Sequence, residues 1–75
     1  MWVDVRLPSE FKYEHIDGAL NLPLKEIRQL AKGLDENKEY VLYCQTGKRS
    51  SAAAFVLTQS GLKAFMLAGG MRDTL

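Results

Sequence analysis

The sequence predicts an α/β domain built on a mainly parallel four-stranded sheet with helices on both faces. Along the chain, short β-forming runs alternate with segments of helix formers, the order expected when crossover helices join parallel strands. The run at 40–43 is apolar without alternation, as expected for a central parallel strand that is covered on both sides. A length of 75 residues is sufficient for one domain at most.

The expected strands begin almost at the first residue. They lie at 2–6, 19–22, 40–43 and 63–68. Pro8 closes the first strand and Pro23 closes the second, because proline cannot donate to a sheet ladder. Asp4 and Arg6 lie two residues apart on the first strand, so they should share one face near its carboxyl end.

Helical segments are expected between these strands, at 9–13, 24–34 and 50–60. Ser9 is the expected N-cap of the first segment, and Glu10 in the same turn is placed to reach back to Arg6 in a structural ion pair. The apolar residues of the second segment fall on one stripe. Those of the third wrap most of the way round, which predicts a well-buried helix, with Gly61 just after its end.

Composition excludes several classes of function. The net charge of +1 gives no case for binding nucleic acid or an anionic membrane surface. No apolar run approaches the roughly 18 residues of a membrane span. His15 is the only histidine and Cys44 the only cysteine, so no internal disulfide can form, and neither a metal site nor a cofactor is expected. A lone thiol favours the cytoplasm, or the periplasm if a signal peptide was removed.

One segment carries the chemistry of the chain. It reads Cys44-Gln45-Thr46-Gly47-Lys48-Arg49-Ser50. Its cysteine lies where a buried strand should turn directly into a helix. Such a turn directs several backbone N–H groups at one point, and the helix dipole adds positive potential there. The thiol should therefore ionise easily, and the thiolate is its reactive form.

Three explanations compete for this cysteine: an inert core residue, a phosphate-binding nucleophile and a sulfur carrier. An inert cysteine needs neither the positive-φ freedom of Gly47 nor the cations Lys48 and Arg49, so that explanation is disfavoured. From Cys44 to Arg49 the loop has six positions, one fewer than the Cys-to-Arg loop of Cys-dependent phosphatases. The tighter loop should fit a phosphate poorly and a single sulfur well, with the amides of 46–49 stabilising a persulfide anion.

The chain resembles the rhodanese family of sulfurtransferases, and in particular its compact phage-shock-type members. The resemblance rests on four segments in the right order. They are Asp-Val-Arg with the following Glu10, His-Ile-Asp-Gly-Ala-Leu-Asn-Leu-Pro at 15–23, the cysteine loop at 44–50, and Leu-Ala-Gly-Gly-Met at 67–71. In that family the cysteine takes the outer sulfur of a donor such as thiosulfate, forms a persulfide, and passes the sulfur to cyanide or a thiol.

The resemblance assigns roles residue by residue. Cys44 is the implied nucleophile and persulfide carrier. The implied substrate-binding residues are Gln45, Thr46, Gly47, Lys48 and Arg49. Asp4 and Arg6 are expected to support the loop from the neighbouring strand, and His15 is expected to be structural. The implied substrates are a small sulfur donor and a thiol or cyanide acceptor, with no metal involved.

The resemblance also implies a single truncated rhodanese-like domain over 1–75. Family members usually open with an edge strand and a helix that have no counterpart before Trp2, and close with a longer helix than 71–75 allows. The missing elements should leave an apolar sheet edge or face exposed, which predicts weak self-association or a partner domain. The alternative function is a noncatalytic rhodanese-like sensor or interaction module of a larger protein, a type that usually lacks the cysteine.

Overall fold

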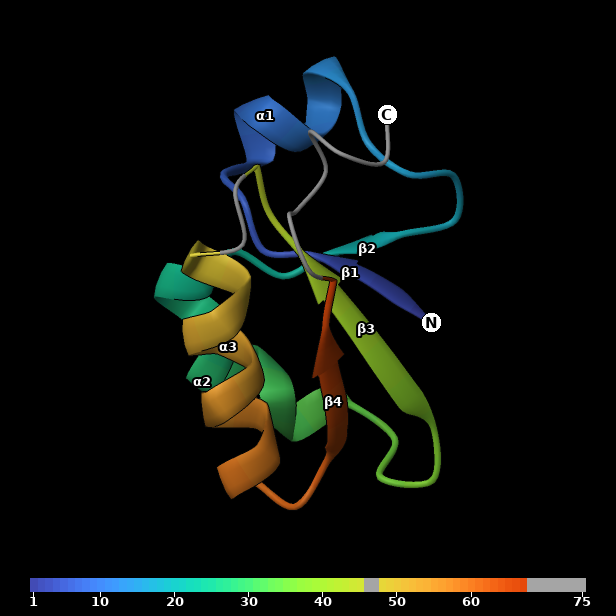
Figure 1. Ribbon diagram of the computed structural model, residues 1–75, viewed down its shortest axis with the longest axis vertical. Coiled ribbons are helices and arrows are strands. Elements are labelled where there is room, and N and C mark those ends of the chain that lie inside the picture. The colour runs from blue at the N-terminus through green and yellow to red at the C-terminus, as the bar shows by residue number, and fades with distance from the viewer. Residues whose placement is uncertain (46–47, 68–75) are drawn as a thin grey trace.

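The computed structural model describes residues 1–45 and 48–67, which contain one four-stranded sheet (Figure 1). Its strands are β1 (Trp2–Asp4), β2 (Leu20–Asn21), β3 (Glu39–Tyr43) and β4 (Lys63–Met66). They lie in the order β2-β1-β3-β4, and each neighbouring pair is parallel. The predicted α/β class and parallel four-stranded sheet are confirmed. The predicted end of the last strand, at 68, lies outside the described residues.

The helical segments between the strands are mostly short. They are α1 (Pro8–Tyr13), η1 (Leu24–Glu26), α2 (Ile27–Leu30), η2 (Ala31–Gly33) and α3 (Lys48–Gln59). The single helix expected at 24–34 is only partly correct, because 3₁₀ turns form both of its ends. Its apolar stripe is as predicted, with Ile27 and Ala31 buried. No helix within the described ranges is long and apolar enough to cross a membrane.

The start of α1 differs from the prediction. Ser9 is not the N-cap; the N-cap is Leu7, whose extended backbone precedes Pro8 at the first helical position. Proline suits that position because its φ is already helical and its missing N–H is not needed there. The carboxylate of Glu10 accepts the N–H of Leu7 at 2.9 Å, so an acidic side chain in the first turn secures the helix start.

Helices α2 and α3 pack together on one face of the sheet, whereas α1 lies beyond the carboxyl ends of the strands (Figure 1). On the packed face, Val3 and Leu42 from the sheet meet Ile27 and Leu57 from the helices, and all four are at most 3% exposed. The helical cover of the two faces is therefore unequal.

The prediction that α3 is buried nearly all round is wrong. Only one side of the helix meets the sheet and α2, and Phe55 is 64% exposed.

The opposite face of the sheet carries a row of apolar side chains. Trp2, Val41 and Phe65 are register partners across β1, β3 and β4, so they point to the same side. Phe65 is 54% exposed, whereas Trp2 and Val41 are half-buried. Weak self-association or a partner domain would cover this row, and that association stays a prediction.

Two glycines close the connections around these elements. Gly18, in the turn before β2, has a φ of +81°, and Gly61, between α3 and β4, has a φ of +86°. Both values lie in the left-handed region, where a side chain is strained and glycine is not. The predicted turn at Gly18 and the predicted helix end at Gly61 are confirmed.

Tyr43 is a buried polar side chain at the carboxyl end of β3. Its hydroxyl oxygen accepts the N–H of Ile16 at 3.0 Å. Burial raises the pKa of Tyr43 to about 12. Because the folded state holds this proton more tightly than the unfolded state, the resulting stabilisation is present below pH ~10 and is lost as the pH rises through the folded-state pKa.

Tyr43→Phe should destabilise the protein at neutral pH by about 1–3 kcal/mol, because the N–H of Ile16 loses its acceptor. The advantage of the wild type should then shrink above pH ~10, since Tyr43 ionises only in the wild type. Urea unfolding of both proteins at about pH 8 and about pH 11 measures the two differences in unfolding free energy. Equal differences at the two pH values would contradict this account of Tyr43.

Candidate active site

Cys44 follows β3 directly, and α3 begins soon after it at Lys48. The predicted position of the cysteine, between a central strand and a helix, is confirmed. The side chain is 1% exposed and joins the hydrophobic core beneath α3. The sulfur therefore lies near the amino-terminal end of a helix of 12 residues, where the helix dipole favours negative charge.

Ser50, in the first turn of α3, contacts the sulfur directly. Its backbone N–H donates to Cys44 Sγ at 3.3 Å, and its hydroxyl oxygen lies 3.5 Å from Sγ. Ser50 is itself fully buried. Sequence reasoning placed the sulfur-binding amides at 46–49 and gave Ser50 no role. The signal that could have found it is its place as the third residue of the helix, where a backbone N–H has no acceptor within the helix.

Asp4 and Arg6 form a buried ion pair at the end of β1, the strand next to β3. Arg6 Nη2 lies 2.8 Å from Asp4 Oδ2, and Arg6 Nε donates to both carboxylate oxygens at 3.0 and 3.1 Å. The backbone N–H of Arg6 adds a bond to Oδ1 at 2.9 Å. Asp4 is 0% exposed and Arg6 4% exposed. The hydrogen bonds from Asp4 raise the pKa of the guanidinium above its usual value.

Arg6 also links this ion pair to the cysteine loop and to α1. Its Nη1 donates to Gln45 Oε1 at 3.4 Å, and its Nη2 donates to the backbone oxygen of Glu14. Asn21 on β2 donates to the backbone oxygens of Asp4 and Arg6, both at 3.1 Å. The end of β1 is therefore held from both neighbouring sides. This geometry favours the predicted role of the pair as loop support, which stays a prediction.

Arg49, in the first turn of α3, pairs with Glu10 of α1. Arg49 Nη1 lies 2.7 Å from Glu10 Oε1, and Nη2 lies 3.1 Å from Oε2, which is a bidentate arrangement. The hydrogen bonds from Arg49 lower the pKa of Glu10 from 4.5 to about 2. The predicted ion pair between Glu10 and Arg6 is therefore wrong, because Arg6 is already held by Asp4 on its own strand.

Lys48 and His15 complete the predicted residues that the structure describes. Lys48 is exposed at the first position of α3. His15 Nδ1 lies 2.7 Å from the backbone oxygen of Phe11, and the two rings stack with centroids 3.8 Å apart. These contacts are local to the end of α1, which agrees with a structural role for His15.

Two predicted substrate-binding residues, Thr46 and Gly47 in the cysteine loop, lie outside the described residues, and their roles stay predictions. Most of the 67–71 segment, which carried part of the family resemblance, also lies outside them. Among the residues that are described, no group of three or more His, Cys, Asp or Glu side chains could hold a metal ion.

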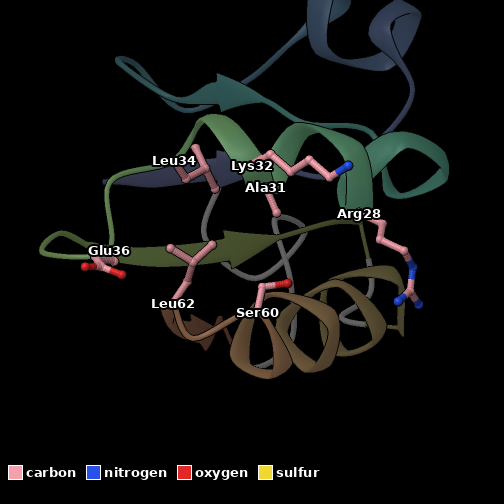
Figure 2. Close-up of a pocket in the computed structure, with 7 residues that line it drawn as sticks. All are labelled: Arg28, Ala31, Lys32, Leu34, Glu36, Ser60 and Leu62. Atoms are coloured by element: carbon pink, nitrogen blue, oxygen red, sulfur yellow. The ribbon is translucent and has the colours of Figure 1, made fainter.

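A cavity of about 410 Å³ lies in another part of the molecule (Figure 2). Its lining consists of Arg28, Ala31, Lys32, Leu34, Glu36, Ser60 and Leu62. Glu36 precedes β3 and Leu62 precedes β4, so this end of the cavity lies at the amino ends of the strands, opposite to Cys44. None of the residues predicted to handle sulfur lines it.

Comparisons with known proteins agree with this fold. The family described as Rhodanese-like domain matches residues 1–74. Thiosulfate sulfurtransferase PspE of Escherichia coli is 38% identical over 74 residues, covering 96% of this chain and 71% of PspE. YrkF of Bacillus subtilis is 38% identical over 72 residues, but the alignment covers only 39% of that longer protein. A rhodanese-related protein of Thermoplasma volcanium superposes with a TM-score of 0.91 at 36% identity, over 96% of this chain and 72% of that one.

These matches span almost the whole chain and combine sequence with structure. The family match includes the cysteine loop and both residues of the buried ion pair. The four-stranded parallel sheet and its helices are shared with the Thermoplasma volcanium protein. The chain belongs to the rhodanese-like domain family.

Proposed function

We propose that this protein is a sulfurtransferase that moves a sulfane sulfur from thiosulfate, or a similar small donor, to a thiol or cyanide through a persulfide on Cys44. The observation that carries the proposal is the contact between the Ser50 N–H and Cys44 Sγ, 3.3 Å, at the start of α3. An amide and a helix dipole directed at one sulfur favour its anionic form. The identity with PspE, which is named a thiosulfate sulfurtransferase, supports the same reaction.

The proposed reaction balances without an oxidant or a cofactor. The Cys44 thiolate attacks the outer sulfur of thiosulfate, a new S–S bond forms, and sulfite leaves with the electron pair of the bond that breaks. The product on the enzyme is a persulfide anion. Cyanide then attacks the outer sulfur, giving thiocyanate and restoring the thiolate. A thiolate acceptor would instead leave with the sulfur as its own persulfide.

The persulfide needs donors around its outer sulfur, and the loop after Cys44 is proposed to supply them. The proposed substrate-binding residues are Gln45, Thr46, Gly47, Lys48 and Arg49. The hydrogen bond from Arg6 to Gln45 supports this assignment, because it fixes the first residue of the loop to the neighbouring strand. Lys48, exposed at the helix start, is proposed to attract anionic donors.

Burial of the cysteine limits what can react with it. Because Cys44 is 1% exposed, a compact inorganic donor is favoured over a bulky one. The same burial would suit an inert core cysteine, but an inert residue gives no reason for the Ser50 amide to be directed at its sulfur.

The noncatalytic module is the alternative function. The cytoplasm is the proposed location, and a partner domain or weak self-association is proposed to cover the exposed face around Phe65.

A steady-state assay tests the proposed function. The protein is incubated with thiosulfate and cyanide, and thiocyanate is measured over time. In a separate reaction it is incubated with an aryl phosphate, and released phosphate is measured. We expect catalytic formation of thiocyanate and no release of phosphate. Hydrolysis of the phosphate ester that depends on Cys44, without thiocyanate formation, would favour a phosphatase instead. Inactivity toward both substrates would favour the noncatalytic module.

A further inference from the structure

Glu10 is the acidic side chain that approaches the cysteine loop from α1. Its two carboxylate oxygens accept one hydrogen bond each from Arg49, at 2.7 and 3.1 Å. Oε1 also accepts the backbone N–H of Leu7 at 2.9 Å. The carboxylate is therefore fixed from its own helix and from α3 at the same time, which a solvated surface glutamate would not be.

Among residues 1–45 and 48–67, helix α1 is held mainly by polar contacts. None of its six residues is buried, so it contributes no side chain to the core. The ties that the structure records between the α1 region and the sheet end are polar, from Arg6 to the Glu14 oxygen and from Ile16 to the Tyr43 hydroxyl. The pair of Glu10 and Arg49 joins α1 to the start of α3.

Arg49 directly precedes Ser50, whose backbone N–H contacts Cys44 Sγ at 3.3 Å. The hydrogen bonds to Glu10, and to a smaller extent negative charge on Cys44, raise the pKa of Arg49 above its usual value. A guanidinium has five N–H donors in one plane, and Glu10 takes one from each terminal nitrogen. A bidentate partner fixes the plane of an arginine that would otherwise lose rotamer entropy when it binds an anion.

We propose that Glu10 is a positioning residue for sulfur transfer: it holds Arg49 in the orientation that stabilises the sulfite leaving from Cys44. The proposal rests on the sulfurtransferase function proposed above. In the step concerned, the S–S bond of thiosulfate breaks and sulfite takes the electron pair, so negative charge builds up on its oxygens. A cation that is fixed in place before that charge develops stabilises the transition state without reorganising.

Paired variants and paired donors test this role. The variants are Glu10→Gln, which removes the charge but keeps the size, Arg49→Met, the double variant, and Glu39→Gln as a control. Glu39 is an exposed glutamate at the opposite end of β3 from Cys44. The donors are thiosulfate, which releases dianionic sulfite, and an alkanethiosulfonate, which releases a monoanionic sulfinate. Values of kcat and KM with cyanide as acceptor are measured for each, with thermal unfolding followed by circular dichroism.

Glu10→Gln should lower kcat/KM for thiosulfate on the order of tenfold, mainly through kcat. It should lower kcat/KM for the alkanethiosulfonate by a smaller factor. In the Arg49→Met background the same change should have no further effect, because the group it positions is gone. Glu39→Gln should match the wild type with both donors.

Several results would overturn the proposal. One is a wild-type kcat/KM for thiosulfate in the Glu10→Gln variant. Another is that Glu10→Gln lowers kcat/KM by the same factor in the Arg49→Met background as in the wild type, which would indicate a general structural role. If Glu10→Gln does not fold, Arg49→Lys tests the proposal instead, since an ammonium cannot form the bidentate pair. Full activity of Arg49→Lys would refute the proposal. A wild type that is inactive with both donors would overturn the proposed function itself, and the inference with it.

Discussion

Replacing Cys44 with serine should abolish sulfur transfer, lowering kcat/KM with thiosulfate by about four orders of magnitude or more. A serine hydroxyl is not ionised near neutral pH and its oxygen cannot carry a sulfane sulfur as a persulfide does. The fold should survive, because Oγ can still accept the N–H of Ser50 that now donates to Sγ. Thiocyanate formation measures the activity, and circular dichroism checks the fold.

Cys44→Ala is the matched variant for this experiment. It removes the hydrogen-bond acceptor as well as the nucleophile, so it should be equally inactive but less stable than Cys44→Ser, by about 1–3 kcal/mol, since the buried Ser50 N–H loses that acceptor. Appreciable turnover by either folded variant would contradict the role of Cys44 as the nucleophile. It would indicate that sulfur transfer does not need the thiol.

Asp4→Asn should be the most destabilising single polar substitution near the site, at about 3–5 kcal/mol. The change leaves the guanidinium of Arg6 buried without a counter-charge, and Arg6 is 4% exposed. A small domain has a total stability of only about 5–15 kcal/mol, so a large fraction of the molecules should unfold at moderate temperature. Urea unfolding of the variant and the wild type at neutral pH measures the loss.

The double variant Asp4→Asn with Arg6→Met separates a lost ion pair from a buried, uncompensated charge. Because the methionine carries no charge, the double variant should be more stable than Asp4→Asn alone. It should still lose activity, since Arg6 no longer donates to Gln45 in the loop. A loss below about 1 kcal/mol for Asp4→Asn would mean that water reaches the pair and that it contributes no more than a surface salt bridge.

The features predicted correctly from the sequence are those that short-range chemistry decides. The place of Cys44 followed from a β-rich run that ends where helix formers begin, and the shared face of Asp4 and Arg6 followed from the two-residue period of a strand. Both are confirmed. The turn at Gly18 was equally local, because its φ of +81° demands glycine.

The features that the sequence did not predict depend on how separate elements meet. Glu10 was assigned to Arg6 because the two are close in the chain, but it pairs with Arg49, which is 39 positions away. The contact of Ser50 with the sulfur depends on the direction of one N–H in the first turn of α3. The unequal cover of the sheet, which leaves Phe65 on the open face 54% exposed, depends on α2 and α3 sharing one face.

The central claim is that Cys44 carries a sulfane sulfur, and the intact mass of the protein tests it most directly. The protein is treated with excess thiosulfate, separated from the donor without reductant, and measured by electrospray mass spectrometry, alongside Cys44→Ser. We predict that the wild type gains the mass of one sulfur atom, that cyanide removes it, and that the variant gains none. A wild type whose mass is unchanged by thiosulfate, or an equal gain in Cys44→Ser, would contradict the claim.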